Sequence, residues 1–283
     1  MVDYSKWSYY LRKWRIIEFD WVLYGVSLFA YAFFTILNKS NAIETPARPF
    51  YVNNATQWYP YQEDSVPTWA VAVFGIICLL ICMLVELLIE AETHRIVSYI
   101  ASLRIFFGGG AAACITLAIV NFFKLFVGKL RPDFLMRCLG EIPSRYSTEI
   151  ITDNSQCVDT GLDLIDGRKA YPSGHSALSF CFATYLVGHF IYAAIRLKQQ
   201  RQLHILSQLV IMSALFPWII AFWVGCTRII NNKHEAEDVN AGAFVGTVMA
   251  ILIVLPLCFS LQHDYNENAK KSKSSTLMYT EYD

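Results

Sequence analysis

The chain has 283 residues, of which 55% are hydrophobic and only 16% are charged. Soluble domains usually carry about 25% charged residues, so this composition argues against a soluble domain and indicates a polytopic membrane protein. Lys and Arg together number 23, as do Asp and Glu, and the formal net charge is zero. Because no overall positive field is available to attract a polyanion, we expect no nucleic-acid partner.

Six charge-free apolar runs are long enough to cross a bilayer as helices. They cover residues 21–37, 69–85, 105–123, 177–195, 205–226 and 239–261. The sequence therefore predicts an all-α integral membrane protein, with a six-helix bundle over residues 21–261. A cytosolic N-terminal segment over 1–20 precedes the bundle, and a polar, disordered cytosolic tail over 262–283 follows it. Pro217 and Pro256 predict kinks in the fifth and sixth spans.

An even number of spans places both termini on one side of the membrane. The short flanks on that side carry more Lys and Arg than loops one and five, so the positive-inside rule predicts cytosolic termini. Loops one, three and five, which follow the first, third and fifth spans, then face the lumen or the exterior. The membrane is expected to be the plasma membrane or an endomembrane. Asn54 begins an Asn-Ala-Thr sequon in loop one and is a glycosylation candidate, unless the tripeptide is a chance occurrence. Cys138 and Cys157 in loop three could form a disulfide there, the alternative being two free thiols.

Lys124 and Arg131 form the first polar cluster, at the exit of the third span. They are seven residues apart, about two helical turns, so both could project from one helical face. Pro132 disfavours helix at Arg131, which would leave that guanidinium able to reach sideways. Two converging cations predict an anion site. The alternative is that both side chains only anchor the helix at the membrane edge.

Ser173, Gly174 and His175 form the second cluster, immediately before the fourth span. A helix start offers unpaired backbone N–H groups and a positive dipole end, which suit a phosphate. His175 would lie in the first turn, where the dipole and nearby cations disfavour its protonation. The alternative is an ordinary N-cap beside an unrelated histidine.

Arg228, His234 and Asp238 form the third cluster, before the sixth span. If His234 and Asp238 share the first helical turn, the carboxylate can accept the Nδ1 proton of the imidazole. That arrangement would leave Nε2 free as a nucleophile. Such pairs are also common as purely structural features. Loops three and five open on the same side, so all three clusters can meet in one pocket.

The motifs K-x6-RP, PSGH and R-x5-H-x3-D, in this order, resemble the three-part signature of the type 2 phosphatidic acid phosphatase family. A closer resemblance, to eukaryotic lipid phosphate phosphatases, comes from RPDFLMRC after the first motif and from a loop-one stretch over residues 49–67. Thr227 departs from the serine that this family usually has, and a loop-three sequon found in many animal members is missing.

The resemblance implies a role for each residue of the three clusters. Lys124, Arg131 and Arg228 would bind the phosphate, assisted by Ser173 and the amide of Gly174. His234 would be the nucleophile, with Asp238 as its orienting partner, and His175 would protonate the departing alcohol.

Elementary chemistry leads to the same reaction, because fixed cations and helix N–H donors can stabilise the charge of a transferring phosphoryl group. We expect no metal and no cofactor, since no carboxylate cluster accompanies the histidines. The predicted function is hydrolysis of lipid phosphomonoesters through a phosphohistidine, the candidates being phosphatidic acid, lysophosphatidic acid, diacylglycerol pyrophosphate and sphingoid-base phosphates. The lipid bilayer is the expected surrounding partner.

Several alternatives stay open. The substrate could be a non-lipid or prenyl phosphate, the reaction could be phosphotransfer, or the protein could be a non-catalytic lipid-binding relative. A homo-oligomer is also open, because the Gly242-xxx-Gly246 pattern in the sixth span can pack against a second copy or against a helix of its own bundle.

Overall fold

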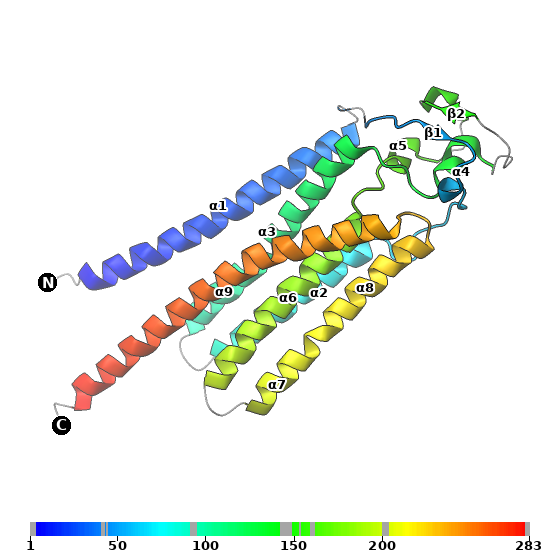
Figure 1. The fold of residues 1–283 in the computed structure, drawn as a ribbon. Coiled ribbons are helices and arrows are strands. Elements are labelled where there is room, and N and C mark those ends of the chain that lie inside the picture. The colour runs from blue at the N-terminus through cyan, green and yellow to red at the C-terminus, as the bar shows by residue number, and fades with distance from the viewer. Residues whose placement is uncertain are drawn as a thin grey trace.

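The computed structural model describes residues 4–40, 43, 45–90, 95–141, 149–152, 154–158, 162–199 and 204–280. Six of its helical segments are long and apolar enough to span a membrane, which confirms the predicted all-α membrane architecture. They lie side by side in one bundle (Figure 1). The bundle contains α1 (Tyr4–Ser40), α2 (Thr68–Glu90), α3 (Arg95–Val127), α6 (Gly174–Gln199), α7 (His204–Ser213) with α8 (Leu215–Ile230), and α9 (Ala236–Thr280).

The fifth span is divided between α7 and α8, with Ala214 between them. Pro217 has no N–H to donate to the carbonyl of Ser213, so the helix is interrupted one turn before the proline. Pro256 lies inside α9 without ending it. Helix α9 also continues to Thr280, which differs from the disordered tail expected after residue 261. Adding residues to an existing helix is much easier than nucleating one, so the spanning segment can extend into polar sequence.

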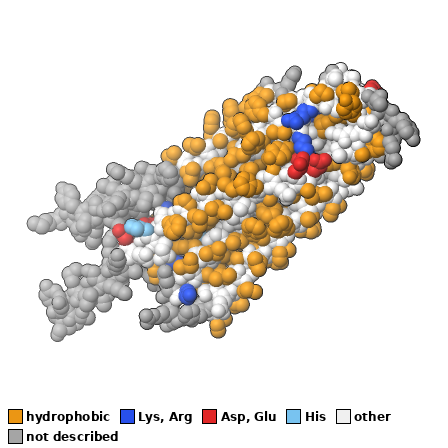
Figure 2. All heavy atoms as spheres, viewed as in Figure 1, with side chains coloured by type: hydrophobic (Ala, Val, Ile, Leu, Met, Phe, Trp, Pro, Cys, Tyr) orange, Lys and Arg blue, Asp and Glu red, His pale blue; other side chains and the backbone are white. Residues whose placement is uncertain are grey.

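Helix α6 lies at the centre of the bundle. Of its most apolar window, 78% is buried, compared with 6–39% for the other spans. The outward faces of the other helices carry large exposed hydrophobic side chains such as Phe29, Trp69 and Phe259. Figure 2 shows one such continuous hydrophobic face, with charged side chains gathered toward its two ends. A surface of this kind fits contact with lipid chains along the bundle.

Glycines bring α9 against α6. A Cβ atom at Gly242 would lie 2.4 Å from the carbonyl oxygen of Ser173, and one at Gly246 would lie 2.0 Å from that of Ala177. Only glycine permits this approach of the two backbones. The Gly242-xxx-Gly246 pattern is therefore used inside the bundle, and it does not provide a face for a second copy.

Loops one and three form a small cap at the end of the bundle opposite both termini (Figure 1). The cap contains β1 (Phe50–Tyr51), η1 (Ala55–Gln57), α4 (Phe134–Leu139), β2 (Ile150–Ile151), η2 (Asn154–Gln156) and α5 (Leu164–Gly167). Strands β1 and β2 pair antiparallel, with Phe50 opposite Ile151. Phe50 and Ile151 of this pair are buried in one cluster with Phe134.

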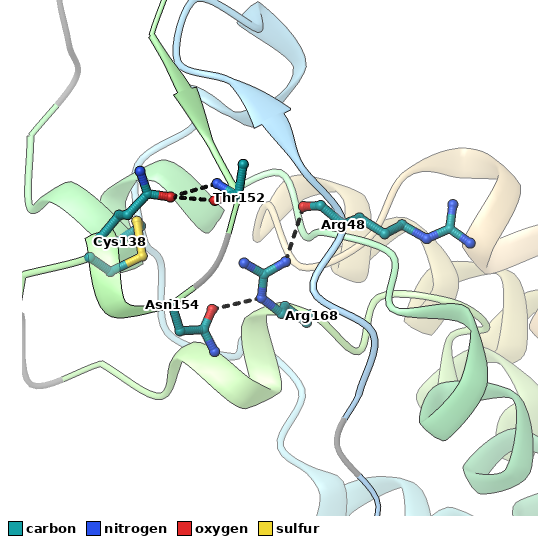
Figure 3. The surroundings of a disulfide bond; sticks show 7 residues. Arg48, Cys138, Thr152, Asn154 and Arg168 are labelled. Atoms are coloured by element: carbon teal, nitrogen blue, oxygen red, sulfur yellow. Dashed lines mark hydrogen bonds between the residues drawn. A yellow bond between two sulfur atoms is a disulfide. The ribbon is translucent and has the colours of Figure 1, made fainter.

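A disulfide joins Cys138 to Cys157 within the cap. Figure 3 shows Arg168 beside it, reaching between two segments of the cap. Its Nε donates to Asn154 Oδ1 at 2.8 Å, and its Nη1 donates to the carbonyl oxygen of Arg48 at 3.3 Å. The bond to Arg48 attaches loop three to loop one, and so it helps to fix the cap above the ends of the spanning helices.

Candidate active site

A cavity of about 280 Å³ lies where the cap meets the ends of the helices. All three predicted clusters contribute to its lining, through Lys124, Arg131, Gly174, His175, Arg228 and His234. The other lining residues are Asp64, Thr68, Val71, Leu117, Val120, Asn121, Asp166 and Leu178. Of the remaining predicted site residues, Ser173 and Asp238 are fully buried and do not line the cavity. The expected convergence of the clusters therefore occurs in the folded chain.

Lys124 and Arg131 reach the cavity from different kinds of backbone. Helix α3 ends at Val127, and Gly128 follows with a φ of 62°, a conformation that favours glycine. The predicted sharing of one helical face by Lys124 and Arg131 is therefore wrong. Loop three positions Arg131 instead, because its N–H donates to the carbonyl of Gly167 at 2.8 Å.

Asp166 forms an ion pair with one nitrogen of the Arg131 guanidinium. Its Oδ1 lies 2.7 Å from Arg131 Nη2, while Arg131 Nε is buried and has no hydrogen-bond partner among the described residues. Burial alone would raise the pKa of Asp166, but the adjacent positive charges, Arg131 first, lower it below its ordinary value. Asp166 is thus ionised at neutral pH, and one edge of the guanidinium is left for another anion.

The start of α6 faces Lys124. The carbonyl of Ser173 accepts the N–H of Ala177 at 3.0 Å, as expected of an N-cap residue. A Cβ atom at Gly174 would lie 3.9 Å from Lys124 Nζ, so the first turn of the helix adjoins this ammonium. His175 Nε2 is buried and has no hydrogen-bond partner in the part of the chain that the structure describes. The positive helix end, Lys124 and an imidazole thus share one wall.

Arg228 lies in the last turn of α8. Its Nη2 is 3.0 Å from Asp64 Oδ1, whereas its Nε and Nη1 are buried without hydrogen-bond partners within the described residues. The neighbouring Thr227 donates its hydroxyl back to the carbonyl of Val224 at 2.7 Å and does not line the cavity. Threonine in place of the family serine therefore leaves the cavity wall unchanged.

His234 does not pair with Asp238 in the way the sequence suggests. Helix α9 begins at Ala236, so His234 precedes the helix, and Asp238 Oδ2 lies 3.8 Å from His234 Nδ1. The carbonyl oxygen of Ala170 lies only 2.7 Å from the same nitrogen. Because a carbonyl can only accept, Nδ1 carries the proton and Nε2 carries the lone pair. The expected tautomer is present, but a backbone carbonyl holds it.

Asp238 joins all three clusters. Its Oδ2 accepts the N–H of Glu235 at 2.9 Å, which caps α9, and its Oδ1 accepts from Lys129 Nζ at 2.8 Å. Its backbone carbonyl accepts the N–H of Ser173 at 3.0 Å. Lys129 also pairs with Glu235 at 2.7 Å and with Glu237. Asp238 therefore links the segments that carry Arg131, His175 and His234.

The electrostatic environment keeps His234 neutral. Burial, followed by the positive charges of the three cations that line the cavity, lowers the pKa of His234 well below its ordinary 6.5. A neutral imidazole with Nε2 unprotonated is the form that can attack phosphorus.

Comparison with known proteins identifies the family of this chain. The PAP2 superfamily matches residues 107–257, more than half of the chain and a region that contains all three clusters. The chain belongs to the PAP2 superfamily. It is 27% identical to Phospholipid phosphatase 1 of Rattus norvegicus over 238 residues, covering 78% of this chain and 79% of the relative. No solved structure matches the chain.

Two further PAP2-related proteins share shorter regions. Lipid phosphate phosphatase 1 of Arabidopsis thaliana is 27% identical over 195 residues, covering 68% of this chain and 54% of the relative. Probable diacylglycerol pyrophosphate phosphatase 1 of Schizosaccharomyces pombe is 32% identical over 146 residues, covering 51% and 50% respectively. The chain thus spans about half the length of some curated relatives that it matches.

Sequence reasoning missed several parts of this candidate site. Asp64 and Asp166 contact the cavity arginines, Lys129 pairs with Asp238, and the carbonyl of Ala170 orients His234. Asp64 lies within the loop-one stretch that resembles lipid phosphate phosphatases, so that resemblance could have indicated it. A backbone carbonyl leaves no trace in the sequence.

Proposed function

We propose that the protein is a membrane lipid phosphate phosphatase that hydrolyses phosphatidate-like phosphomonoesters through a phosphohistidine intermediate. One observation carries the proposal. Arg131 Nε and Arg228 Nε and Nη1 are buried N–H donors without hydrogen-bond partners among the described residues, His175 Nε2 is a further buried nitrogen without one, and all belong to side chains that line one cavity. Unsatisfied buried donors are costly, so their gathering at one place calls for an anion with several oxygen acceptors. A phosphate meets that requirement.

The phosphate would lie between Lys124, Arg131 and Arg228. Guanidinium groups bind phosphate oxygens through parallel N–H donors, and the ammonium and the start of α6 supply further positive charge. Charge that develops on the transferring phosphoryl group is stabilised by groups already in place. This arrangement supports a reaction that needs no metal ion.

His234 would attack phosphorus with the lone pair of Nε2, forming the N–P bond as the ester P–O bond breaks. His175 would donate a proton to the departing alkoxide, so that the lipid leaves as an alcohol. Water would then attack the phosphohistidine while His175 takes its proton, and cleavage of the N–P bond would release phosphate and neutral His234. The Ala170 carbonyl supports this sequence by holding the Nδ1 proton throughout.

The apolar part of the cavity lining favours a lipid substrate. Val71 on α2, Leu117 and Val120 on α3, and Leu178 on α6 line the cavity next to the charged groups. All four belong to membrane-spanning helices, so a headgroup could reach the cations while its chains stay in the bilayer. The names of the relatives, which refer to lipid phosphate, phospholipid and diacylglycerol pyrophosphate phosphatases, point to the same substrate class.

A substrate panel tests the function. Purified protein in detergent micelles would be given phosphatidic acid, lysophosphatidic acid, diacylglycerol pyrophosphate, a sphingoid-base phosphate, a prenyl phosphate and a water-soluble phosphomonoester, with EDTA present throughout. We expect phosphate release from the lipid phosphomonoesters to exceed release from the soluble ester. Preference for the soluble or prenyl ester would reject the phosphatidate-like assignment, and activity abolished by EDTA would reject the metal-free mechanism.

The two histidines can be separated by the leaving group. His175→Ala should recover part of its rate on an activated aryl phosphate, whose leaving group needs no proton, and should still form an acid-labile phosphoenzyme. His234→Ala should do neither. Labelled phosphoenzyme in His234→Ala, or an equal loss of rate on both substrates in His175→Ala, would show that the roles are assigned wrongly.

We also propose that the cavity opens on the lumenal or external side, as the distribution of Lys and Arg predicts. Single cysteines would replace Ser155 in the cap and His263 near the opposite end, in a background where the exposed Cys226 is changed to Ser. A membrane-impermeant maleimide applied to intact cells should label only the cap position. Labelling of position 263 alone would show that the topology is the reverse of the predicted one. Asn54, whose Oδ1 accepts a hydrogen bond from the N–H of Thr56, remains the predicted glycosylation site on the same side.

A further inference from the structure

Asp64 of loop one contributes a carboxylate, 34% exposed, to the lining of the cavity that would bind phosphate. Its Oδ1 lies 3.0 Å from Arg228 Nη2, and its side chain lines the cavity together with both histidines. We propose that Asp64 competes with phosphate for the cavity cations, so that inorganic phosphate binds weakly and leaves readily after each turnover. This inference rests on the proposed function.

The loop holds Asp64 in this place through its neighbours. The N–H of Ser65 donates to Asn231 Oδ1 at 3.2 Å, and Asn231 Nδ2 donates to Ser65 Oγ at 2.9 Å. Asn232 Nδ2 donates to the carbonyl of Pro60 at 3.0 Å. These bonds attach loop one to the turn that follows α8, only a few residues beyond the guanidinium that Asp64 contacts. The carboxylate is therefore kept beside the cavity and can change its position mainly by rotating its side chain.

Charge makes this carboxylate an opponent of phosphate. An ionised carboxylate accepts hydrogen bonds and cannot donate one, and the same holds for the oxygens of a phosphate dianion. Both anions therefore compete for the N–H donors of Arg228 within a cavity of about 280 Å³. If Asp64 stays on Nη2, it repels the phosphate; if it moves away, it gives up a charge-assisted hydrogen bond. In either case its negative charge lowers the affinity for phosphate.

The penalty affects the product more than the substrate. Inorganic phosphate binds only through its oxygens, whereas the lipid phosphate is also retained by its chains in the bilayer and beside Val71, Leu117 and Leu178. Weakening the shared headgroup contacts thus leaves the substrate bound while the product departs. Asp64 would thereby be a residue that selects esters against free phosphate.

A different role for Asp64 predicts the opposite sign. If the carboxylate mainly oriented the Arg228 guanidinium for catalysis, its removal would loosen the arginine and weaken phosphate binding. Glu63 provides a matched control, because it is an adjacent acid in the same loop and is exposed, as Asp64 is, but it does not line the cavity.

The test measures binding of inorganic phosphate to purified full-length protein in micelles. The dissociation constant would be taken from calorimetry for wild type, Asp64→Asn and Glu63→Gln, and the inhibition constant of phosphate from the rate of lipid hydrolysis. We expect Asp64→Asn to bind phosphate about tenfold more tightly and to be inhibited at correspondingly lower phosphate, with Glu63→Gln unchanged. Asp64→Ser, which removes the same charge with a smaller side chain, should shift both constants in the same direction.

The outcomes separate this inference from the function on which it rests. Unchanged or weaker phosphate binding in both Asp64 variants, with wild type binding phosphate, would overturn the competition by Asp64 and leave the phosphatase assignment standing. An equal tightening in Glu63→Gln would also overturn it, since the effect would then be a general property of loop charge. Failure of wild type to hydrolyse any phosphomonoester would reject the proposed function itself.

Discussion

Replacing Asp238 by Asn tests how His234 is held. If Asp238 accepted the Nδ1 proton directly, the change would present an amide to the imidazole and disturb its tautomer, which in serine protease triads costs about 10⁴-fold in kcat. In the structure, Nδ1 donates that proton to the carbonyl oxygen of Ala170 at 2.7 Å, and Asp238 Oδ2 lies 3.8 Å from the nitrogen. The tautomer should therefore survive the substitution.

The remaining contribution of Asp238 is electrostatic and positional. A carboxylate 3.8 Å from the imidazole would stabilise its phosphorylated, cationic form by about 4 kcal/mol at an effective dielectric constant of about 20. In the loose transition state of phosphoryl transfer the N–P bond is only partly formed, so the imidazole carries only part of this positive charge and roughly half of the attraction acts on the rate. About 2 kcal/mol remains, which corresponds to a loss of about 30-fold in rate.

The assay is kcat on a lipid phosphate for Asp238→Asn and for Glu237→Gln, together with the thermal unfolding temperature of both. Glu237 is the control because it also pairs with Lys129 but is 69% exposed. We expect a loss of about 30-fold for Asp238→Asn and a loss below about threefold for Glu237→Gln, since exposed ion pairs contribute little. A loss near 10⁴-fold with an unchanged unfolding temperature would refute the reasoning and make Asp238 the direct partner of His234.

Three further predictions concern charge, protonation and the cap. Arg131→Lys and Arg228→Lys should each lower kcat/KM by about 10²–10³-fold, because lysine keeps the charge but not the parallel N–H donors; full activity in both variants would remove the bidentate argument. Since burial and the neighbouring cations lower the pKa of His234 well below 6.5, its ¹⁵N imidazole signals should report the neutral form at pH 6.5, and stability should fall as the pH drops below 6.5; half-protonation at or above 6.5 would contradict this. Replacing Cys138 and Cys157 together by Ser should lower the unfolding free energy by about 2–4 kcal/mol in denaturant titrations, and no change would mean that the cap is held without the disulfide.

The sequence by itself determined the membrane class, the six spans and the residues that would gather at one end. Apolar runs long enough to cross a bilayer have no other stable form than a helix, so Trp69, for example, could be assigned to a span from the surrounding sequence alone. The even number of spans and the position of each cluster at a span boundary then placed Lys124, His175 and His234 on one side. These are local or counting properties of the chain, and for that reason sequence suffices for them.

Tertiary structure alone decided which groups contact one another. The spacing of His234 and Asp238 suggested a helical pair, but α9 begins at Ala236, and the backbone of loop three supplies the carbonyl of Ala170 from 64 residues away. Loop one likewise brings Asp64 onto Arg228, far along the chain. Such contacts depend on how loops close over the helix ends, and a hydrogen bond to a backbone carbonyl places no constraint on the identity of the residue that provides it. Sequence patterns therefore identify the reactive side chains, while the partners that orient and oppose them are fixed only when the chain is folded.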